Sequence, residues 1–354
     1  MPETSVLIGM CGGVDSSVTA FLLQQQGYRC IGCTMRLHIS PCGGEDNTKD
    51  ARSVAHRLGI PFQEFDCTDT FTARVIDNFI TSYEQGLIPN PCIECNRYLK
   101  FGAMLDKALS TGCDYVATGH YARIEQASDT GRFLLKKAAD QAKDQTYFLY
   151  NLSQHQLSHT LFPLGSLTKE QARQIAEAQG FLNARKRDSQ DICFVPDGDY
   201  VAFMERHTGK HYPAGDYLDL SGKVVGRHKG AVCYTLGQRK GLGIALGAPA
   251  YVCGKDMEKN TVTLGPNEAL FANALRAKNW NWIPFPALAE PMRVTAKIRH
   301  SQTEQAATVY PEADGSARVV FDASQRAITP GQAVVLYQGD LVVGGGTIIE
   351  SFTI

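Results

Sequence analysis

Residues 5–27 place a short apolar run, a glycine pair and a helical pattern in direct succession, and this order restricts the fold more than any other feature of the chain. Val6-Leu7-Ile8 predicts a buried strand, Gly12-Gly13 a tight turn, and the apolar residues from Val14 to Leu22 recur at helical spacing. Such a turn points backbone N–H groups inward, and the helix N-terminus adds a positive dipole. The segment predicts a phosphate-binding loop; the alternative is an N-capped helix after a plain glycine turn.

The residues after the glycine pair supply the other groups of an anion site. Ser16 and Ser17 offer hydroxyls, and Asp15 offers a carboxylate for a metal ion that bridges phosphates. The chain has no G-x-x-x-x-G-K-[ST] pattern, so this is not a Walker loop.

The first half of the chain alternates predicted strands and helices, which predicts an α/β domain with a parallel sheet covered by helices on both faces. Further strands are expected at 30–35, 62–65 and 115–117, and helices at 50–58 and 71–83. A capping-box signal at Thr168 opens another helix that runs to Gly180.

The second half is rich in glycine, proline and short β-like runs. Runs at 231–236 and 250–253 predict a small β-rich central domain. Runs at 292–298, 306–310, 317–321, 333–337 and 341–343 predict a small antiparallel β-barrel. We therefore expect three domains, at residues 1–200, 201–268 and 269–354.

Composition excludes several classes of protein. With 44% hydrophobic and 20% charged residues the chain is typical of a globular protein, and no apolar run reaches the length of about 18 residues that a membrane span needs. The N-terminus lacks the basic region of a signal peptide, so we expect a cytoplasmic protein.

The eleven cysteines are many for such a location, but a chain of 354 residues can bury a core without disulfides. Five lie in strand-like runs and are expected to be small buried hydrophobes: Cys30, Cys33, Cys67, Cys233 and Cys253. Five others lie at loop or turn signals and are candidates for chemistry: Cys11, Cys42, Cys92, Cys95 and Cys193.

The net charge of −1 does not by itself indicate a nucleic-acid partner. Any contact with RNA would depend on the local basic clusters Arg185-Lys186-Arg187, Arg227-His228-Lys229 and Arg239-Lys240. Each cluster taken alone is typical of a solvated surface; together they would make a stripe that faces RNA.

Gly12-Gly13-Val14-Asp15-Ser16-Ser17 resembles the pyrophosphate loop of the N-type ATP pyrophosphatases, which split ATP between its α and β phosphates and adenylate a carbonyl oxygen. Cys11 stands where that superfamily usually has a serine, which puts one hydroxyl contact in doubt.

Six further segments resemble one member of that superfamily, the bacterial tRNA-specific 2-thiouridylases. They follow one another through nearly the whole chain: Asn90 to Asn96, Ala117 to Arg123, Lys143 to Leu149, Asp188 to Phe194, Tyr234 to Gly243, and Thr329 to Gln332. The resemblance implies an adenine nucleotide alpha hydrolase-like domain followed by a central domain and a barrel. It also implies ATP-dependent adenylation of the C2 oxygen of the wobble uridine in tRNA and its replacement by sulfur, with release of AMP and pyrophosphate.

The resemblance also assigns residues and partners. ATP, with Mg²⁺, would be held by Gly9, Met10, Cys11, Gly12, Gly13, Val14, Asp15, Ser16, Met35 and Gly119. The RNA would be met by His120, Lys143, Asp144, Gln145, Arg299, His300 and Gln332, with Asn90, Pro91 and Cys92 beside the target base. The sulfur would come from a persulfide or sulfide donor, a sulfur-relay protein or a cysteine desulfurase. We expect a monomer.

By the same resemblance Cys193 carries a persulfide and Cys95 takes up the resulting disulfide, and these two join Asp15 as catalytic residues. The polar stretch from Asp188 to Asp191 suits a mobile loop. One departure matters, because Cys92 stands where the family commonly has an aspartate and creates a C-x-x-C pair.

The C-x-x-C pair admits several interpretations. Cys92, Cys95 and Cys193 would leave one iron of a [4Fe–4S] cluster open for sulfide, as in related RNA thiolases. A zinc site would need a fourth ligand, which Cys42 would supply only by an accident of the fold. A redox pair is disfavoured because the cysteines follow Pro91 in an expected loop. The cluster and the persulfide–disulfide interpretations both stay open.

Two rival functions share parts of this pattern. A small-molecule amide ligase of the same superfamily would use the phosphate loop but would need no cysteine pair and no basic barrel. A non-enzymatic RNA-binding protein would not need Asp15, Ser16 and Ser17, which are all present.

Overall fold

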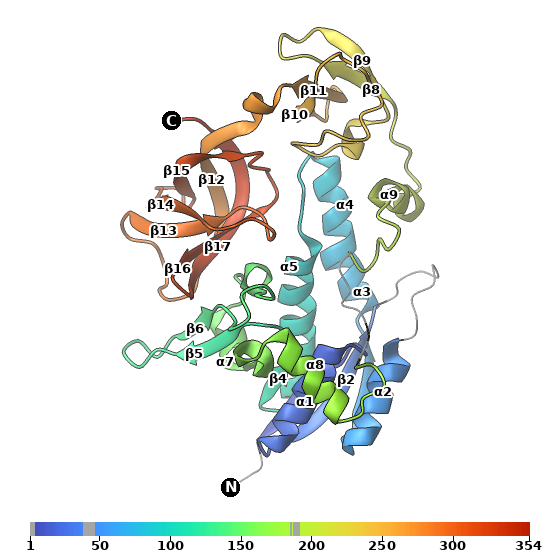
Figure 1. Cartoon of the computed structure of the whole chain (residues 1–354), viewed down its shortest axis with the longest axis vertical. Coiled ribbons are helices and arrows are strands. Elements are labelled where there is room, and N and C mark those ends of the chain that lie inside the picture. The colour runs from blue at the N-terminus through green and yellow to red at the C-terminus, as the bar shows by residue number, and fades with distance from the viewer. Residues whose placement is uncertain (1–3, 38–46, 185, 187–191) are drawn as a thin grey trace.

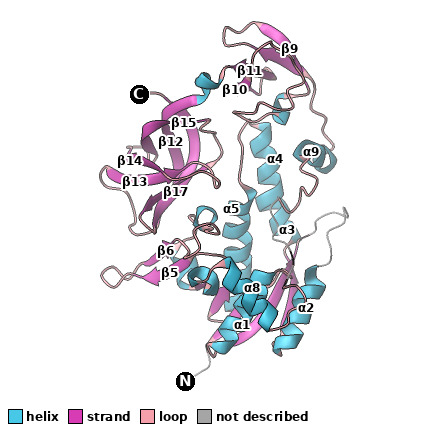
Figure 2. Ribbon diagram, in the orientation of Figure 1, coloured by secondary structure: helices cyan, strands magenta, loops and turns pink. Residues whose placement is uncertain are grey.

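A computed structural model describes residues 4–37, 47–184, 186 and 192–354 of the chain. An α/β part, a small β-rich part and a β-barrel follow one another along the sequence (Figure 1). Helices are concentrated in the first part and strands in the other two (Figure 2). Predictions that concern Cys42, Arg185, Arg187 and the stretch from Asp188 to Asp191 lie outside the described residues.

The α/β part is built on a parallel sheet, as the sequence predicts, with five strands in the order β3-β2-β1-β4-β7; the four predicted strands are present and β7 (Thr160–Leu161) is an addition to them. Alternate residues of β1 (Ser5–Gly9) point to opposite faces, so Val6 and Ile8 lie on one face and Leu7 on the other. Helices α1 (Val14–Gln25), α2 (Asn47–Leu58) and α8 (Lys169–Ala178) cover the first face. The capping box that opens α8 at Thr168 is present, as predicted.

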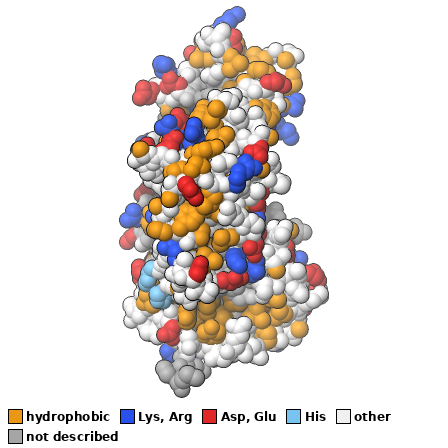
Figure 3. Space-filling model, turned by 90° about the vertical axis from the view of Figure 1, so that its left-hand side faces the viewer, with side chains coloured by type: hydrophobic (Ala, Val, Ile, Leu, Met, Phe, Trp, Pro, Cys, Tyr) orange, Lys and Arg blue, Asp and Glu red, His pale blue; other side chains and the backbone are white. Residues whose placement is uncertain are grey.

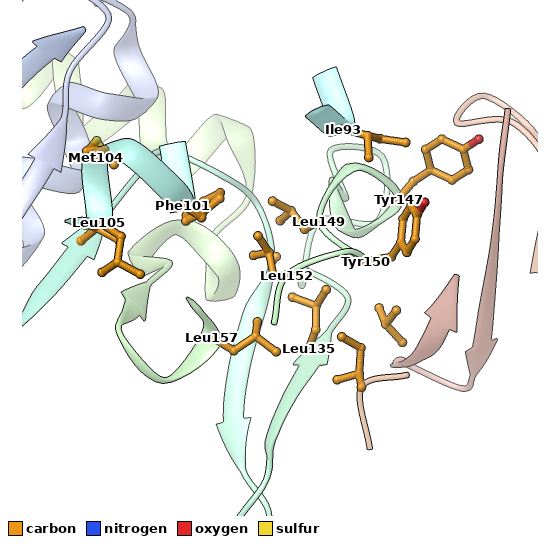
Figure 4. Close-up of a cluster of buried hydrophobic side chains, with 14 of the residues drawn as sticks. Ile93, Phe101, Met104, Leu105, Leu135, Tyr147, Leu149, Tyr150, Leu152 and Leu157 are labelled. Atoms are coloured by element: carbon orange, nitrogen blue, oxygen red, sulfur yellow. The ribbon is translucent and has the colours of Figure 1, made fainter. Parts of the chain in front are cut away.

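Helical residues cover the other face of the sheet, and the core that they form continues to the barrel. This core joins Leu7 and Val116 to helical residues such as Phe101 and to barrel residues such as Tyr337. Figure 4 shows how this cluster runs from the α/β helices, through Tyr147 and Tyr150, to the barrel strands. The two parts therefore bury one continuous hydrophobic core.

The barrel is closed by six antiparallel strands in the order β12-β15-β14-β13-β16-β17, with β17 pairing back to β12. All five strands predicted there are present. The first strand, β12 (Phe271–Trp282), is an addition to them. A hairpin of the α/β part, β5 (Arg123–Gln126) and β6 (Phe133–Lys136), meets β17 where Leu341 pairs with Lys136. This pairing is a second connection between the barrel and the α/β part.

The central part contains a four-stranded sheet in the order β10-β11-β8-β9 with its own core. The predicted strand at 250–253 is confirmed by β10 (Tyr251–Asp256). The predicted strand at 231–236 is wrong, because Ala231–Cys233 forms a 3-10 turn. Gly230, with φ of 123°, turns the chain there, and the side-chain oxygen of Asn260 accepts the Ala231 N–H. An apolar run of this length is buried in either conformation, so its pattern does not distinguish them.

The remaining elements complete the chain. Those of the α/β part are β2 (Arg29–Arg36), β3 (Phe62–Asp66), α3 (Thr68–Phe71), η1 (Thr72–Ile76), α4 (Asp77–Glu84), α5 (Pro91–Cys95), η2 (Asn96–Ala103), α6 (Met104–Ser110), β4 (Tyr115–Ala117), η3 (Thr146–Phe148), α7 (Gln154–Ser158), β7 (Thr160–Leu161) and η4 (Pro163–Ser166). Those after it are α9 (Tyr200–Thr208), β8 (Gly215–Leu218), β9 (Val224–His228), η5 (Ala231–Cys233), β11 (Thr261–Gly265), η6 (Asn267–Leu270), β13 (Met292–Lys297), β14 (Gln305–Pro311), β15 (Ala317–Arg326), β16 (Ala333–Gln338) and β17 (Leu341–Phe352).

Candidate active site

The predicted phosphate loop lies between β1 and α1 at the carboxyl edge of the parallel sheet, where ligands bind in folds of this kind. Gly12 adopts φ of 71°, and Gly13 at the N-cap brings no side chain to occupy the first-turn amides of α1. The side-chain amide of Asn183 donates to the Gly12 carbonyl oxygen at 3.0 Å and to the Ser17 hydroxyl at 2.9 Å. Asn183 therefore holds the loop and the first turn of α1 together.

Gly119 reaches the same edge of the sheet just after β4. A Cβ atom at this position would lie 2.8 Å from the backbone carbon of Asp15 and 2.9 Å from the Ser16 nitrogen. Only glycine lets the end of β4 approach the first turn of α1 this closely. Met35, near the end of the neighbouring strand β2, is half-buried. Gly119 thus lies against the start of α1, beside the loop that the resemblance assigns to ATP.

The carboxylate of Asp15 is held by two residues that sequence reasoning missed. The ammonium of Lys169 lies 2.8 Å from both carboxylate oxygens, and the Tyr121 hydroxyl donates to one of them at 2.9 Å. Lys169 is only 8% exposed. Its one sequence signal was its place at the start of the capped helix, which says nothing of its partner.

His120 lies under the surface at this edge, only 8% exposed. Its Nδ1 pairs with the Thr118 hydroxyl at 2.7 Å, and its Nε2 lies 3.4 Å from the ammonium of Lys100. Burial, with Lys100 as a further cause, holds the pKa of His120 well below its usual value. The imidazole is therefore neutral near pH 7 and contributes no positive charge toward RNA.

Cys92 and Cys95 lie in helix α5, and the prediction of a loop after Pro91 is wrong. The Asn90 side chain caps the helix by accepting the Cys92 N–H at 3.2 Å, and Pro91 occupies the first helical position, where its missing N–H costs nothing. Asn-Pro is as typical of a helix start as of a turn. Here the Asn90 side chain caps the first turn, so the segment forms a helix.

Cys193 is positioned by the residue that follows it. Phe194 is buried with its ring edge-on to Phe71 at 5.8 Å and to Phe79 at 5.3 Å between centroids. The same hydrophobic cluster contacts Cys95. The core beneath these residues thus brings two thiols, about 100 positions apart in sequence, to the same region.

The three candidate thiols are close enough to act on one another electrostatically. Burial, with Cys95 and Cys92 as further causes, raises the pKa of Cys193 to about 12. Burial also raises the pKa values of Cys95 and Cys92, and Lys100 acts on all three thiols in the opposite direction. Each described cysteine is a free thiol.

The arrangement of the three cysteines does not match a metal-binding site. Within the described ranges, which include Cys92, Cys95 and Cys193, no set of three or more His, Cys, Asp or Glu side chains is placed to hold a metal ion. The three thiols share a neighbourhood without the convergence that an iron–sulfur cluster needs. We therefore derive no step through a cluster.

Two side chains of the predicted RNA-binding loop at 143–145, Asp144 and Gln145, accept hydrogen bonds from within the protein. Asp144 accepts the Ala138 N–H at 3.0 Å and the Thr146 hydroxyl, and Gln145 accepts the Tyr121 N–H at 2.9 Å. Burial raises the pKa of Asp144. This loop is therefore a braced turn and is connected to the phosphate loop through Tyr121.

The three barrel residues predicted to meet RNA lie in three different environments. His300 lies over Phe148, with ring centroids 4.3 Å apart, so it adjoins the 143–145 loop. Gln332 donates to the Ile88 carbonyl oxygen at 2.8 Å, just before Asn90. Arg299 is turned within the barrel, where it donates to Ala327 and Thr329.

The predicted basic stripe is contradicted at one position. His228 is 3% exposed and packs against Tyr217 and Tyr234, so it belongs to the core of the central part. The face in Figure 3 mixes Lys and Arg with Asp and Glu around a hydrophobic band, so it carries no continuous field of one sign. Among the described residues, no helix has the length and apolar character to cross a membrane.

Comparison with known proteins places the chain in a family. Three family models match in succession: a tRNA methyl transferase HUP domain at residues 4–197, a tRNA methyl transferase PRC-barrel domain at 201–266, and an aminomethyltransferase β-barrel domain at 272–348. The tRNA-specific 2-thiouridylase MnmA of Acetivibrio thermocellus is 51% identical over 98% of this chain and 100% of its own length. The chain belongs to the tRNA-specific 2-thiouridylase family. The family protein of Clostridioides difficile is 49% identical over 98% of both chains, and that of Halothermothrix orenii is 49% identical over 98% of this chain and 99% of its own.

Proposed function

We propose that this chain is a tRNA-uridine 2-sulfurtransferase that adenylates the C2 oxygen of the wobble uridine with ATP and replaces that oxygen with sulfur. One observation carries the proposal. Lys100 contacts His120 at the edge of the sheet that holds the phosphate loop, and the same lysine acts on the pKa values of Cys92, Cys95 and Cys193. The groups suited to adenylation therefore adjoin the groups suited to sulfur transfer.

Adenylation is the task of the phosphate loop. The uridine C2 oxygen attacks the α-phosphorus, the N3 proton is lost, and pyrophosphate leaves with the electrons of the broken P–O bond. The backbone amides at the start of α1 and the Ser16 hydroxyl bind the phosphates, whereas the buried Ser17 hydroxyl donates to the Gly13 carbonyl oxygen and supports the loop. Mg²⁺ held at Asp15 would neutralise part of the charge of the leaving pyrophosphate.

Sulfur transfer is the task of the two thiols. A donor persulfide passes its outer sulfur to Cys193, and that sulfur attacks C2 and displaces AMP. The Cys95 thiolate then attacks the Cys193 sulfur and releases 2-thiouridine, which leaves a Cys95–Cys193 disulfide. An external thiol reduces the disulfide, so each turnover consumes one persulfide and one two-electron thiol reductant.

The functional test separates the two tasks. The full chain is given unmodified tRNA, ATP and a chemically generated persulfide, and both ATP–pyrophosphate exchange and 2-thiouridine are measured. Cys193→Ser and Cys95→Ser are expected to abolish thiolation and to retain tRNA-dependent exchange. Cys253→Ser, in the central part, is the matched control and should retain both.

Two outcomes would favour other functions. Exchange that needs a small carboxylic acid and ignores tRNA would indicate an amide ligase. Tight tRNA binding without any ATP turnover would indicate a non-enzymatic RNA-binding protein. The family relationship and the thiols beside the phosphate loop support the thiolase over both.

Further assignments belong to the same proposal. The protein acts as a cytoplasmic monomer with domains at 1–200, 201–268 and 269–354, and it receives sulfur from a relay protein or a desulfurase. The cluster alternative is tested by anaerobic reconstitution with iron and sulfide assay. Stoichiometric thiolation by iron-free protein that Cys92→Ala leaves unchanged would exclude it.

A further inference from the structure

Two histidines lie one turn apart on α7, a helix to which the proposed function gives no role. His155 is exposed, and His159, the residue that ends the helix, is half-buried. Their ring centroids are 4.6 Å apart, and the planes of the two rings meet at 51°. Residues four positions apart share one face of a helix, and two histidines at this spacing are a helical pattern for binding Zn²⁺. The pair is therefore a candidate metal site separate from the phosphate loop and the thiols.

Hydrogen bonding determines which nitrogen of the His159 ring carries the proton. The Nδ1 atom lies 2.9 Å from both the His155 carbonyl oxygen and the Ser158 hydroxyl. Because a carbonyl oxygen only accepts, Nδ1 carries the proton of the neutral ring, and Nε2 keeps the lone pair that binds a metal ion. Histidines that bind metal ions commonly have this arrangement, in which the other ring nitrogen donates to a backbone carbonyl.

The backbone that carries the two rings is fixed by contacts of its own. A capping box between Ser153 and Gln156 holds the start of α7. The Gln156 side chain also donates to the Phe101 carbonyl oxygen at 2.7 Å. At the other end of the helix, the His159 carbonyl oxygen accepts the Val116 N–H of β4 at 2.8 Å. A metal ion would thus meet ligands on an ordered backbone, which reduces the entropy lost on binding.

The donor set indicates which kind of ion would bind. Imidazole nitrogens suit Zn²⁺, Cu²⁺ and Ni²⁺, whereas Mg²⁺ prefers oxygen ligands. Within the part of the chain that the structure describes, no third His, Cys, Asp or Glu side chain completes a set of three with this pair. The protein would therefore supply two ligands, and water would fill the remaining positions of the ion.

We propose that His155 and His159 together bind one late first-row divalent transition-metal ion, such as Zn²⁺, through Nε2 of His159 and a ring nitrogen of His155. The site is independent of ATP, RNA and the sulfur-transfer thiols. In the rival interpretation the two rings only pack against each other on the surface.

The test is labelling of histidines in the full chain by diethyl pyrocarbonate, measured residue by residue by mass spectrometry with and without Zn²⁺. A ring nitrogen that binds Zn²⁺ does not react, so Zn²⁺ should protect His155 and His159 over the same concentration range. His56 is exposed on α2 and has no histidine one turn away, so its labelling should not change. Mg²⁺ should protect none of the three. If Zn²⁺ leaves the labelling of His155 and His159 unchanged, the proposal is wrong.

Single substitutions show whether the two rings share one ion. His155→Gln should raise the Zn²⁺ concentration that protects His159 at least about tenfold, since even the hydrogen-bond partners of metal ligands are worth roughly 10- to 100-fold in affinity. His159→Gln should do the same for His155, and His56→Gln, the matched control, should change neither. Protection of each histidine that does not depend on the other would mean that they share no ion, which contradicts the proposal.

A further variant separates this site from the thiols, which also bind Zn²⁺ as thiolates. The triple variant Cys92→Ser, Cys95→Ser, Cys193→Ser should keep the protection of His155 and His159 at the same Zn²⁺ concentration. Loss of protection in this variant would place the ion at the cysteines and overturn the proposal. A chain that thiolates no tRNA but keeps the paired protection would disprove the proposed function and leave the metal site in place.

Discussion

The side chain of Gln332 donates a hydrogen bond to the carbonyl oxygen of Ile88 at 2.8 Å, and the Ile88 N–H returns one to the Pro330 carbonyl at 3.0 Å. These bonds join the barrel to the segment that leads into α5, the helix of Cys92 and Cys95. The barrel therefore takes part in setting where that helix starts.

Gly331→Ala should disturb this junction. Gly331 has φ of 90°, and a Cβ atom there would lie 2.6 Å from the Ile88 nitrogen. We expect a loss of about 3 kcal/mol in the free energy of unfolding, from backbone strain together with the steric clash, and reduced thiolation. Gly315→Ala is the matched control, because Gly315 also has positive φ but open space around it. It should lose only about 1 kcal/mol. Equal losses from the two variants in denaturant melts would contradict the prediction.

Asn90→Ala should remove the cap of the cysteine helix. The expected loss is about 1 kcal/mol of stability, with a larger fall in thiolation than in ATP–pyrophosphate exchange, since the first turn carries Cys92. Asn90→Asp keeps the acceptor oxygen and should restore stability. Ser153→Ala removes the cap of α7 and should cost a similar stability without the fall in thiolation.

The alkylation rate of Cys193 should increase about tenfold per pH unit from pH 7 to pH 10, without a plateau. Alkylation requires the deprotonated thiolate. Because the pKa of Cys193 is raised to about 12, only a small fraction of the thiol is deprotonated throughout this range. Iodoacetamide labelling followed by mass spectrometry measures the rate. Lys100→Met should slow labelling, because Lys100 lowers the pKa, whereas Lys107→Met should not. A plateau by pH 9 would show that the raised pKa is wrong.

Lys255→Met should stabilise the protein near pH 7 and remove a pH dependence. Among the residues that the structure describes, none accepts a hydrogen bond from the buried Lys255 ammonium, and burial lowers the pKa of Lys255 to about 8 from an ordinary value near 10.5. Between these two values the unfolded chain binds the proton and the folded chain does not, so stability from this group rises from pH 8 to 10.5. Below pH 8 the full penalty, about 3 kcal/mol, is present.

Denaturant melts of both proteins across pH 7 to 10.5 measure this difference, which should disappear toward high pH. Lys259→Met, an exposed position on the turn after β10, is the control and should show no such trend. An unchanged difference at every pH would mean that the Lys255 amine does not titrate as described.

Local signals predicted much of the fold. The strand, glycine turn and helix around Gly12 were readable because each needs only neighbouring residues, and the capping box at Thr168 is equally local. The barrel strands follow from alternation and turns. The run at 231–236 was predicted wrongly because its conformation depends on Asn260, a residue far along the chain.

The site was less accessible from sequence. Cys95 and Cys193 were assigned by resemblance, whereas their approach depends on Phe194 packing against Phe71 and Phe79. The ion pair between Lys169 and Asp15 joins residues 154 positions apart, and no sequence pattern predicts it. Such contacts are set by tertiary packing alone.

The core that joins Leu7 to Tyr337 and Val342 also constrains how the protein is made. The ribosome releases the first strand long before it has synthesised the last partners of that strand's core. The nascent α/β part therefore leaves the Tyr147–Tyr150 end of this core without its barrel partners until the barrel emerges, although domains commonly fold as they appear. The barrel thus completes the core of the part of the molecule that is synthesised before it.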